Sequence, residues 1–203
     1  MDIYTDYGNW KFENHEFISE LVKNKSKTIS RFTPVIAVVD YLYDKVCQNK
    51  KLTSDEEVFF STGFDYIYDQ FLFIKTLYEV KFNNDYKELD KYSQTINLLL
   101  YINEFQAEAL NYTNLPQNDL KMLDDLEKRV HKHLDNKENA PDEYFLLLDE
   151  IVDNIFSYYG IELVLIDQIF NEVALEYQIF NEEDDFDIYN MIINKQIEKT
   201  RNK

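Results

Sequence analysis

The chain has 203 residues, a formal net charge of −18 and an isoelectric point of about 4.5. Apolar residues make up 45% of it and aromatic residues 16%, which is enough material for a folded core and excludes global disorder. A surface with this charge repels nucleic acid and anionic lipid, so we expect neither as a direct ligand. The ligand classes that it attracts are basic protein surfaces and divalent cations.

The scarcity of helix breakers indicates an all-helical fold. Only three Gly and three Pro are present, and all of them except Gly63 fall outside or at the ends of segments with helical periodicity. We therefore predict an all-α single domain over residues 1–203, a bundle of about six to eight mostly antiparallel helices. Residues 1–14 are expected to form an irregular or partly helical arm, followed by a short helix over 16–24. An N-cap threonine followed by proline predicts the next helix, over 33–48.

The later helices follow from a capping signal and from apolar stripes. Ser54 and Glu57 have the spacing of a capping box, in which each side chain satisfies a backbone N–H at the other end of the turn. This box predicts the start of a long helix over 54–81. The segment 86–111 is apolar on two sides, which is typical of the central helix of a bundle. Further helices are expected over 117–134, 141–159, 161–180 and 186–200.

Several classes of enzyme site are missing from the sequence. It has no glycine-rich phosphate-binding motif, no Glu-x-x-His pair of the di-iron bundles and no Cys/His zinc spacing. Cys47 lies within an apolar pattern and is expected to be a small buried side chain. His131 and His133 are near the end of a predicted helix, where they are expected at the surface, offsetting the helix dipole.

Several features of the sequence favour a cytoplasmic location. The first residues hold no apolar signal segment, and no apolar run approaches the roughly 18 residues needed to cross a bilayer. One cysteine cannot form an intramolecular disulfide, which fits a reducing compartment. We therefore expect a cytoplasmic protein, in a bacterial or a host cytosol, without membrane contact. Its richness in Asn, Lys, Ile, Tyr and Phe is typical of an AT-rich genome, such as that of a low-GC bacterium, its phage or a large DNA virus.

Two carboxylate pairs with i,i+3 spacing stand on neighbouring predicted helices. Asp124 and Glu127 lie on the first, and Glu150 and Asp153 lie on the second, at a matching distance from the turn between them. Residues at i and i+3 share a helix face, so the four could converge and bind Mg²⁺ through oxygen ligands. Glu150, however, lies almost opposite the apolar stripe of its helix. The alternative is that these are solvated faces and that Glu127 pairs with His131.

The segment 147–153 is similar to the second acidic motif of the all-helical nucleoside triphosphate pyrophosphohydrolases, the MazG and dimeric dUTPase superfamily. This resemblance covers residues 120–163. It implies a Mg²⁺-dependent hydrolase in which Glu127 and Glu150 are catalytic and the metal ligands are Asp124, Glu127, Glu150 and Asp153. The first pair departs from the pattern, because Asp124 stands where the superfamily has Glu, and the basic and aromatic residues that follow it in dimeric dUTPases have no counterpart.

A dense acidic run precedes the last predicted helix, and it exceeds what a helix N-terminus requires. We predict that it contacts a partner through Glu182, Glu183, Asp184, Asp185 and Asp187. Acidity can also serve solubility alone. Our leading interpretation is a non-enzymatic helical protein without a cofactor that binds a protein with a basic surface, as an inhibitor, an immunity protein or a phage or viral counter-defence factor. The Mg²⁺-dependent pyrophosphohydrolase is the alternative, and a helical adaptor with an apolar groove is a third hypothesis.

Overall fold

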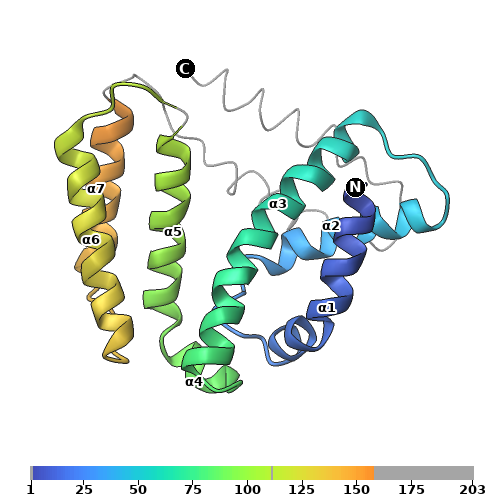
Figure 1. Ribbon diagram of the computed structural model, residues 1–203, viewed down its shortest axis with the longest axis horizontal. Coiled ribbons are helices and arrows are strands. Elements are labelled where there is room, and N and C mark those ends of the chain that lie inside the picture. The colour runs from blue at the N-terminus through green and yellow to red at the C-terminus, as the bar shows by residue number, and fades with distance from the viewer. Residues whose placement is uncertain (1, 111, 158–203) are drawn as a thin grey trace. The chain divides into compact units, whose positions relative to one another are not determined.

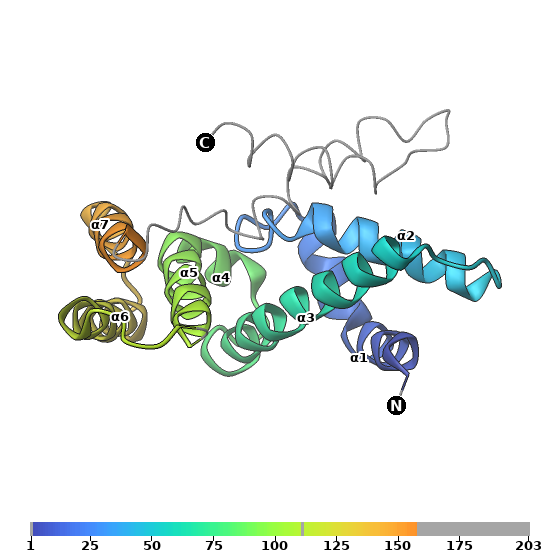
Figure 2. The same cartoon turned by 90° about the horizontal axis from the view of Figure 1, so that it is seen from above.

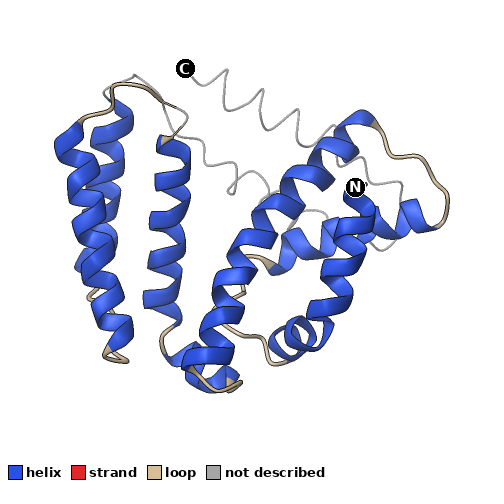
Figure 3. Ribbon diagram, in the orientation of Figure 1, coloured by secondary structure: helices blue, strands red, loops and turns tan. Residues whose placement is uncertain are grey.

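The computed structural model describes residues 2–110 and 112–157, and this part of the chain contains helices and turns but no strand (Figures 1 and 3). The predicted all-α class is confirmed. Within these residues there are seven α-helices, and the helices predicted over 161–180 and 186–200 lie outside them. The elements are α1 (Ile3–Lys23), α2 (Thr33–Cys47), α3 (Ser54–Thr76), the π-helical segment η1 (Leu77–Lys81), α4 (Tyr86–Lys91), α5 (Ser93–Ala109), α6 (Gln117–Asp135) and α7 (Glu143–Ser157).

The chain divides into two compact units. The described residues of the first unit run to Lys75 and comprise α1, α2 and nearly all of α3. Those of the second unit begin at Thr76 and comprise η1 and helices α4 to α7. Each unit buries its own set of apolar side chains, as described below.

The first unit has an aromatic core, and α1 contributes buried side chains to it. The buried positions of α1 recur every three or four residues, so they form one continuous face of the helix: Tyr7, Trp10, Asn14, Phe17 and Leu21. The prediction of an irregular or partly helical arm over 1–14, with a short helix over 16–24, is therefore corrected to one helix that begins at Ile3. The arm is helical because its aromatic side chains are buried against α3.

The contacts between α1 and α3 show that the two helices run in the same direction. The ring centroids of Tyr4 and Phe60 lie 4.9 Å apart, and those of Phe17 and Phe71, further along both helices, lie 6.1 Å apart. Most of the aromatic ring pairs between α1 and α3 meet edge to face. This arrangement adds to the free energy that is gained from burial alone. The packing fixes which residues of α1 face which residues of α3.

The capping box of α3 lies one residue earlier than predicted. The Glu56 carboxylate accepts a hydrogen bond from the backbone N–H of Thr53 at 2.9 Å, and the Glu56 N–H donates to the Thr53 hydroxyl at 3.3 Å. The box is therefore Thr53 with Glu56, in place of Ser54 with Glu57. Glu56 is chosen because its second carboxylate oxygen also pairs with Lys45 of α2 at 2.7 Å.

Replacing Thr53 with alanine is expected to lower the free energy of unfolding by about 1 kcal/mol, because the oxygen that caps the helix is removed. Urea unfolding measures this change. Ser54→Ala is the matched control, and we expect it to change stability by less than about 0.5 kcal/mol. The opposite order of the two effects would show that the cap lies at Ser54.

Cys47, the last residue of α2, is exposed, so the expectation of a buried thiol is wrong. The apolar stripe of α2 ends one turn earlier: Val39 and Leu42 are fully buried, whereas Val46 is only partly covered. The sequence pattern extends the stripe to the helix end, but the neighbouring helices no longer cover this last turn.

The second unit is built around α5. Figure 2 views α5, α6 and α7 nearly end-on, and they form the corners of a triangle. The predicted single helix over 86–111 is interrupted at Tyr92, which separates α4 from α5. The prediction that this segment is apolar on two sides is confirmed, because α5 buries residues around its circumference: Ile96, Leu98, Leu99, Leu100 and Ile102.

A buried threonine ties the connection between α6 and α7 to the start of α5. The Thr95 hydroxyl accepts a hydrogen bond from the Ala140 N–H at 2.8 Å and donates to the Glu138 carbonyl oxygen at 3.2 Å. Both backbone groups belong to the connection, so one side chain replaces the hydrogen bonds that water would otherwise provide there.

Candidate functional site

The first carboxylate pair of the predicted Mg²⁺ site faces α5 and its own helix. Asp124 and Glu127 both accept hydrogen bonds from the amide of Gln106 on α5, at 3.4 Å and 2.8 Å. Glu127 also lies 3.7 Å from the imidazole Nε2 of His131, as the alternative interpretation expected. The i,i+3 spacing does place the two carboxylates together, but an amide occupies the position at which a cation would have to bind.

The second pair, Glu150 and Asp153, is exposed on α7. The buried side chains of α7 include Leu148, Ile151, Val152 and Ile155, with Glu150 on another side of the helix. Across the residues that the structure describes, no group of three or more His, Cys, Asp or Glu side chains is placed to hold a metal ion. The four carboxylates are thus not gathered into a Mg²⁺ site, because α6 and α7 turn their acidic faces in different directions.

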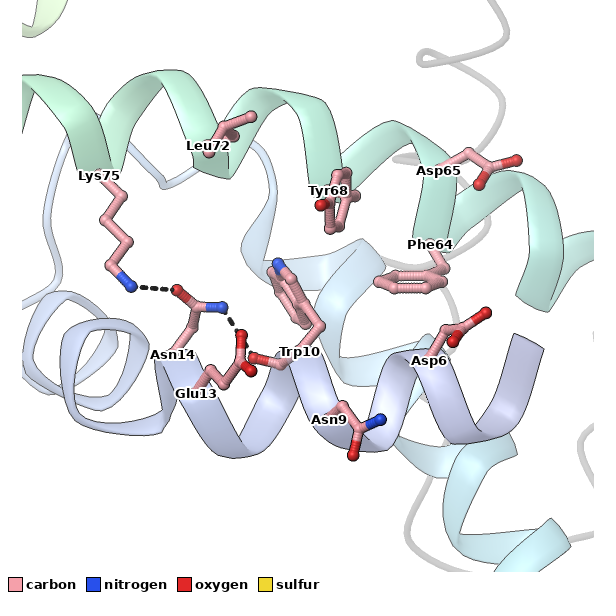
Figure 4. A pocket seen from close by; sticks show the side chains of 10 residues that line it. All are labelled: Asp6, Asn9, Trp10, Glu13, Asn14, Phe64, Asp65, Tyr68, Leu72 and Lys75. Atoms are coloured by element: carbon pink, nitrogen blue, oxygen red, sulfur yellow. Dashed lines mark hydrogen bonds between the residues drawn. The ribbon is translucent and has the colours of Figure 1, made fainter. Parts of the chain in front are cut away.

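A groove of about 520 Å³ lies between α1 and α3, wholly within the first unit (Figure 4). Each helix contributes one stripe of side chains to it. On α3 the stripe contains Asp65, Tyr68 and Leu72, at spacings of three and four residues that keep them on one face. On α1 the corresponding residues are Asp6 and Glu13, beside the buried face that packs against α3.

The floor of the groove is aromatic. Trp10 and Phe64 are 7% and 6% exposed, and their rings meet edge to face with centroids 5.7 Å apart. Tyr68 and Leu72, on the α3 side, are 45% and 58% exposed, so they present apolar surface to solvent along the groove. Apolar side chains left open between two helices are typical of surfaces that contact another molecule.

Three carboxylates surround this floor: Asp6 and Glu13 on α1, and Asp65 on α3. Within the described residues, none of these three side chains has a hydrogen bond or an ion pair. Asp40 of the same unit differs, because Lys11 pairs with it at 2.6 Å. The groove therefore combines an aromatic surface with three carboxylates that form no ion pair among the described residues, a combination suited to a positively charged group.

One end of the groove carries a positive charge. The Lys75 ammonium donates to the Asn14 side-chain oxygen at 2.8 Å, and the Asn14 amide donates to the Trp10 carbonyl oxygen at 2.7 Å (Figure 4). Asn14 is buried, so this chain of hydrogen bonds fixes where the Lys75 ammonium lies. Asp6 and Asp65 lie toward the opposite end.

The acidic run over 182–187 lies outside the described residues and remains a prediction. His131 is partly exposed, and the His133 ring packs edge to face on Tyr144 at 5.6 Å, so the second histidine has a packing role besides its position near the helix end. Among the described helices, none is both long and apolar enough to cross a membrane.

The groove was not predicted, although part of its signal is present in the sequence. Tyr7, Trp10 and Phe17 have helical spacing, and Asp6 and Glu13 flank them. Reading this pattern as a helix would have shown an aromatic face with acidic borders, but not that α3 packs beside it. Comparison of the chain with protein-family models, with curated proteins and with solved structures finds no match, so function has to be inferred from the groove itself.

Proposed function

We propose that this protein acts without catalysis, by binding a partner protein that has a basic surface, and that the groove between α1 and α3 is its docking site. The observation that carries the proposal is the set of three carboxylates without cationic partners, Asp6, Glu13 and Asp65, around an aromatic floor. The net charge of −18 supports it, because it attracts a basic surface from a distance.

The carboxylates and the aromatic rings of the groove contribute to binding in different ways. The carboxylates attract and orient a lysine or arginine side chain, and at the rim they mainly raise the rate of association. The rings of Trp10 and Tyr68 then offer a surface on which the aliphatic stem and the cationic head can pack. Arginine is the best fit, because its planar guanidinium can stack on an aromatic ring and at the same time donate hydrogen bonds to a carboxylate.

The class of partner follows from this chemistry. Proteins that bind nucleic acid expose clusters of arginine and lysine that hold phosphates. An acidic protein that covers such a cluster would act as an inhibitor, in the manner of an immunity protein or a phage or viral counter-defence factor. The acidic run Glu182, Glu183, Asp184, Asp185 and Asp187 is proposed as a second contact with the same partner.

The groove contains its own reporter, since Trp10 is the single tryptophan of the chain. An oligoarginine peptide, used as a model of a basic surface, is expected to change the Trp10 emission on binding. The dissociation constant should rise steeply with salt concentration, because exposed charges are screened within about 10 Å at 0.1 M salt. An emission spectrum that the peptide leaves unchanged, or an affinity that salt does not alter, would contradict the proposal.

Neutralising the three groove carboxylates together, as Asp6→Asn, Glu13→Gln and Asp65→Asn, is expected to weaken oligoarginine binding about tenfold at low salt. The matched control neutralises three exposed acids of α7, as Asp149→Asn, Glu150→Gln and Asp153→Asn. Both variants lose the same charge, so a general field effect is equal in the two.

We expect the α7 variant to bind the peptide within about twofold of the native protein. Equal loss in the two variants would assign binding to net charge alone and remove the groove from the proposal. The α7 variant also changes Glu150 and Asp153 of the predicted Mg²⁺ site. Thermal unfolding of both variants, compared with the native chain, shows whether either substitution set disturbs the fold.

A further inference from the structure

The last part of α6 is basic, although the chain as a whole is acidic. Residues 128–137 contain four Lys or Arg and a single acid, whereas the whole chain has 21 Lys or Arg against 39 acids. That one acid, Asp135, pairs with Lys81 at 2.7 Å. Arg129 and Lys132 make no ion pair within the part of the chain that the structure describes. The charges of these two side chains are therefore free to meet a ligand.

Arg129 is positioned across the boundary between α6 and α7. Its guanidinium carbon lies 5.2 Å from the centroid of the Tyr144 ring. The helix dipole favours cations in the last turn of α6, where Lys132 lies, but Arg129 lies one turn earlier and packs on α7. Together with Asn136, these side chains line a hollow of about 390 Å³. Guanidinium, ammonium and amide groups all donate hydrogen bonds, so the hollow suits an anion with several acceptor oxygens.

One acid lines the same hollow. Glu138 is exposed on the connection after α6, and its carboxylate lies 3.5 Å from Nδ1 of His133. Its charge opposes an anion, so its removal should improve binding. The volume of this hollow lies within the range of small-molecule sites, roughly 300–1,000 Å³, so there is room for more than an isolated ion.

A second hollow, of about 520 Å³, lies along the same two helices and shares Arg129 with the first. Helices α6 and α7 lie side by side in both views and are joined by a short connection, so they run antiparallel (Figures 1 and 2). Asp125 and Lys128 lie 3.5 Å apart and offset each other's charge. Met122 is 44% exposed and presents apolar surface. The side chains that line this second hollow are Met122, Asp125, Lys128, Arg129, Leu147 and Ile151.

We infer that the two hollows, together the α6–α7 furrow, bind a small phosphate monoester with an apolar organic part. The phosphate lies at Arg129 and Lys132, and the apolar part lies along Met122, Leu147 and Ile151. A phosphate monoester carries close to two negative charges at neutral pH, because its second pKa is about 6, and two cations match it. The site belongs to the second unit, and the inference does not depend on the proposed function of the groove between α1 and α3.

The test titrates the full chain with hexyl phosphate, inorganic phosphate and hexanol, and follows the backbone amides by NMR. We expect hexyl phosphate to bind about tenfold more tightly than either of the other two, because it alone uses both hollows. The amides that shift should belong to α6, α7 and their connection. Equal affinity for inorganic phosphate, shifts confined to other helices, or no shift at millimolar concentration would each overturn the inference.

Replacing both cations, as Arg129→Gln with Lys132→Gln, is expected to weaken hexyl phosphate binding about tenfold. The matched control, Lys87→Gln with Lys121→Gln, removes the same charge from two exposed lysines of the same unit and should change the affinity by less than about twofold. Equal losses in the two double variants would assign binding to net charge and remove the furrow as a site.

Two further variants separate binding from damage to the fold. Glu138→Gln should tighten hexyl phosphate binding about threefold, a gain that lost packing cannot produce. Met122→Ser should weaken hexyl phosphate binding about threefold and leave inorganic phosphate unchanged. Leu146→Ser, at a residue of α7 that is 70% exposed and does not line the furrow, is its control and should change neither affinity. Weaker binding in Glu138→Gln, or equal effects of the two serine variants, would contradict the inference.

Discussion

Replacing Phe71 with alanine is expected to lower the free energy of unfolding by about 3–5 kcal/mol, the cost of removing a buried phenylalanine from a packed core. Phe71 is almost fully buried, and its ring lies within about 6 Å of the rings of three residues: Trp10 at 5.9 Å, Phe17 at 6.1 Å and Phe32 at 5.9 Å. The substitution therefore leaves a cavity between α1, α3 and the residue that precedes α2. Urea unfolding followed by circular dichroism measures the loss.

The neighbouring residue provides a matched control. Leu72 follows Phe71 on α3 but is 58% exposed, so Leu72→Ala is expected to cost less than about 1 kcal/mol. A loss of less than about 1.5 kcal/mol for Phe71→Ala would contradict the packing described here, because it would mean that the ring is not enclosed on all sides. Trp10 emission adds a local readout, since the cavity forms beside that ring.

Above about pH 10 the protein is expected to lose stability, and Tyr7 is expected to account for about 1.4 kcal/mol of this loss per pH unit. Burial of the phenol, and then the nearby negative charge of Asp40, raise the pKa of Tyr7 above the ordinary value of 10.0. In the unfolded chain the phenol loses its proton near pH 10, whereas in the folded protein it keeps it. Stability from this group is therefore fully present below about pH 10 and declines as the pH rises further.

The variant Tyr7→Phe tests this assignment. It removes the titrating group, so the loss of stability between about pH 10 and pH 12 should be smaller than in the native protein by up to about 2.7 kcal/mol. At neutral pH the variant should be less stable by about 1–2 kcal/mol, because the Tyr7 hydroxyl donates to Asp40 and phenylalanine cannot. Urea unfolding at a series of alkaline pH values measures both effects. Identical slopes for the two proteins would contradict a buried, protonated Tyr7.

Local signals in the sequence were sufficient for most helix boundaries. The predicted helix over 33–48 and the one over 117–134 each agree with the structure to within one residue at both ends. Proline at the start of a helix and a break in the apolar pattern at its end act within a few residues, so they can be read without knowing the fold. The interruption at Tyr92 could not be read in this way, because the residues on both sides continue the apolar pattern.

The first helix was missed because its local and tertiary preferences disagree. Gly8 and Asn9 are poor helix formers, so local preference alone does not favour a continuous helix over residues 1–14. The burial of Tyr7, Trp10 and Phe17 against α3 outweighs that local cost. Intrinsic preference amounts to less than about 1 kcal/mol per residue, whereas burying one large apolar side chain gives about 1.5–3 kcal/mol.

The two candidate sites show what a helical repeat can and cannot predict. The spacing of Asp124 and Glu127 correctly placed them on one face, since both contact Gln106. It could not predict which neighbouring helix that face meets, which depends on how the apolar stripes of α5, α6 and α7 pack. The groove presents the same difficulty, because Trp10 and Phe64 are more than fifty residues apart in the chain.

The two hydrogen bonds of Thr95 restrict which substitutions evolution could accept at this position. Valine has the same shape, but it would leave the Ala140 N–H and the Glu138 carbonyl without the hydroxyl that now serves both. Asparagine and aspartate are too large for a position that is fully enclosed. Serine is the one ordinary replacement that keeps the hydroxyl, so proteins descended from the same ancestor should carry threonine or serine here for as long as they keep this junction of three helices.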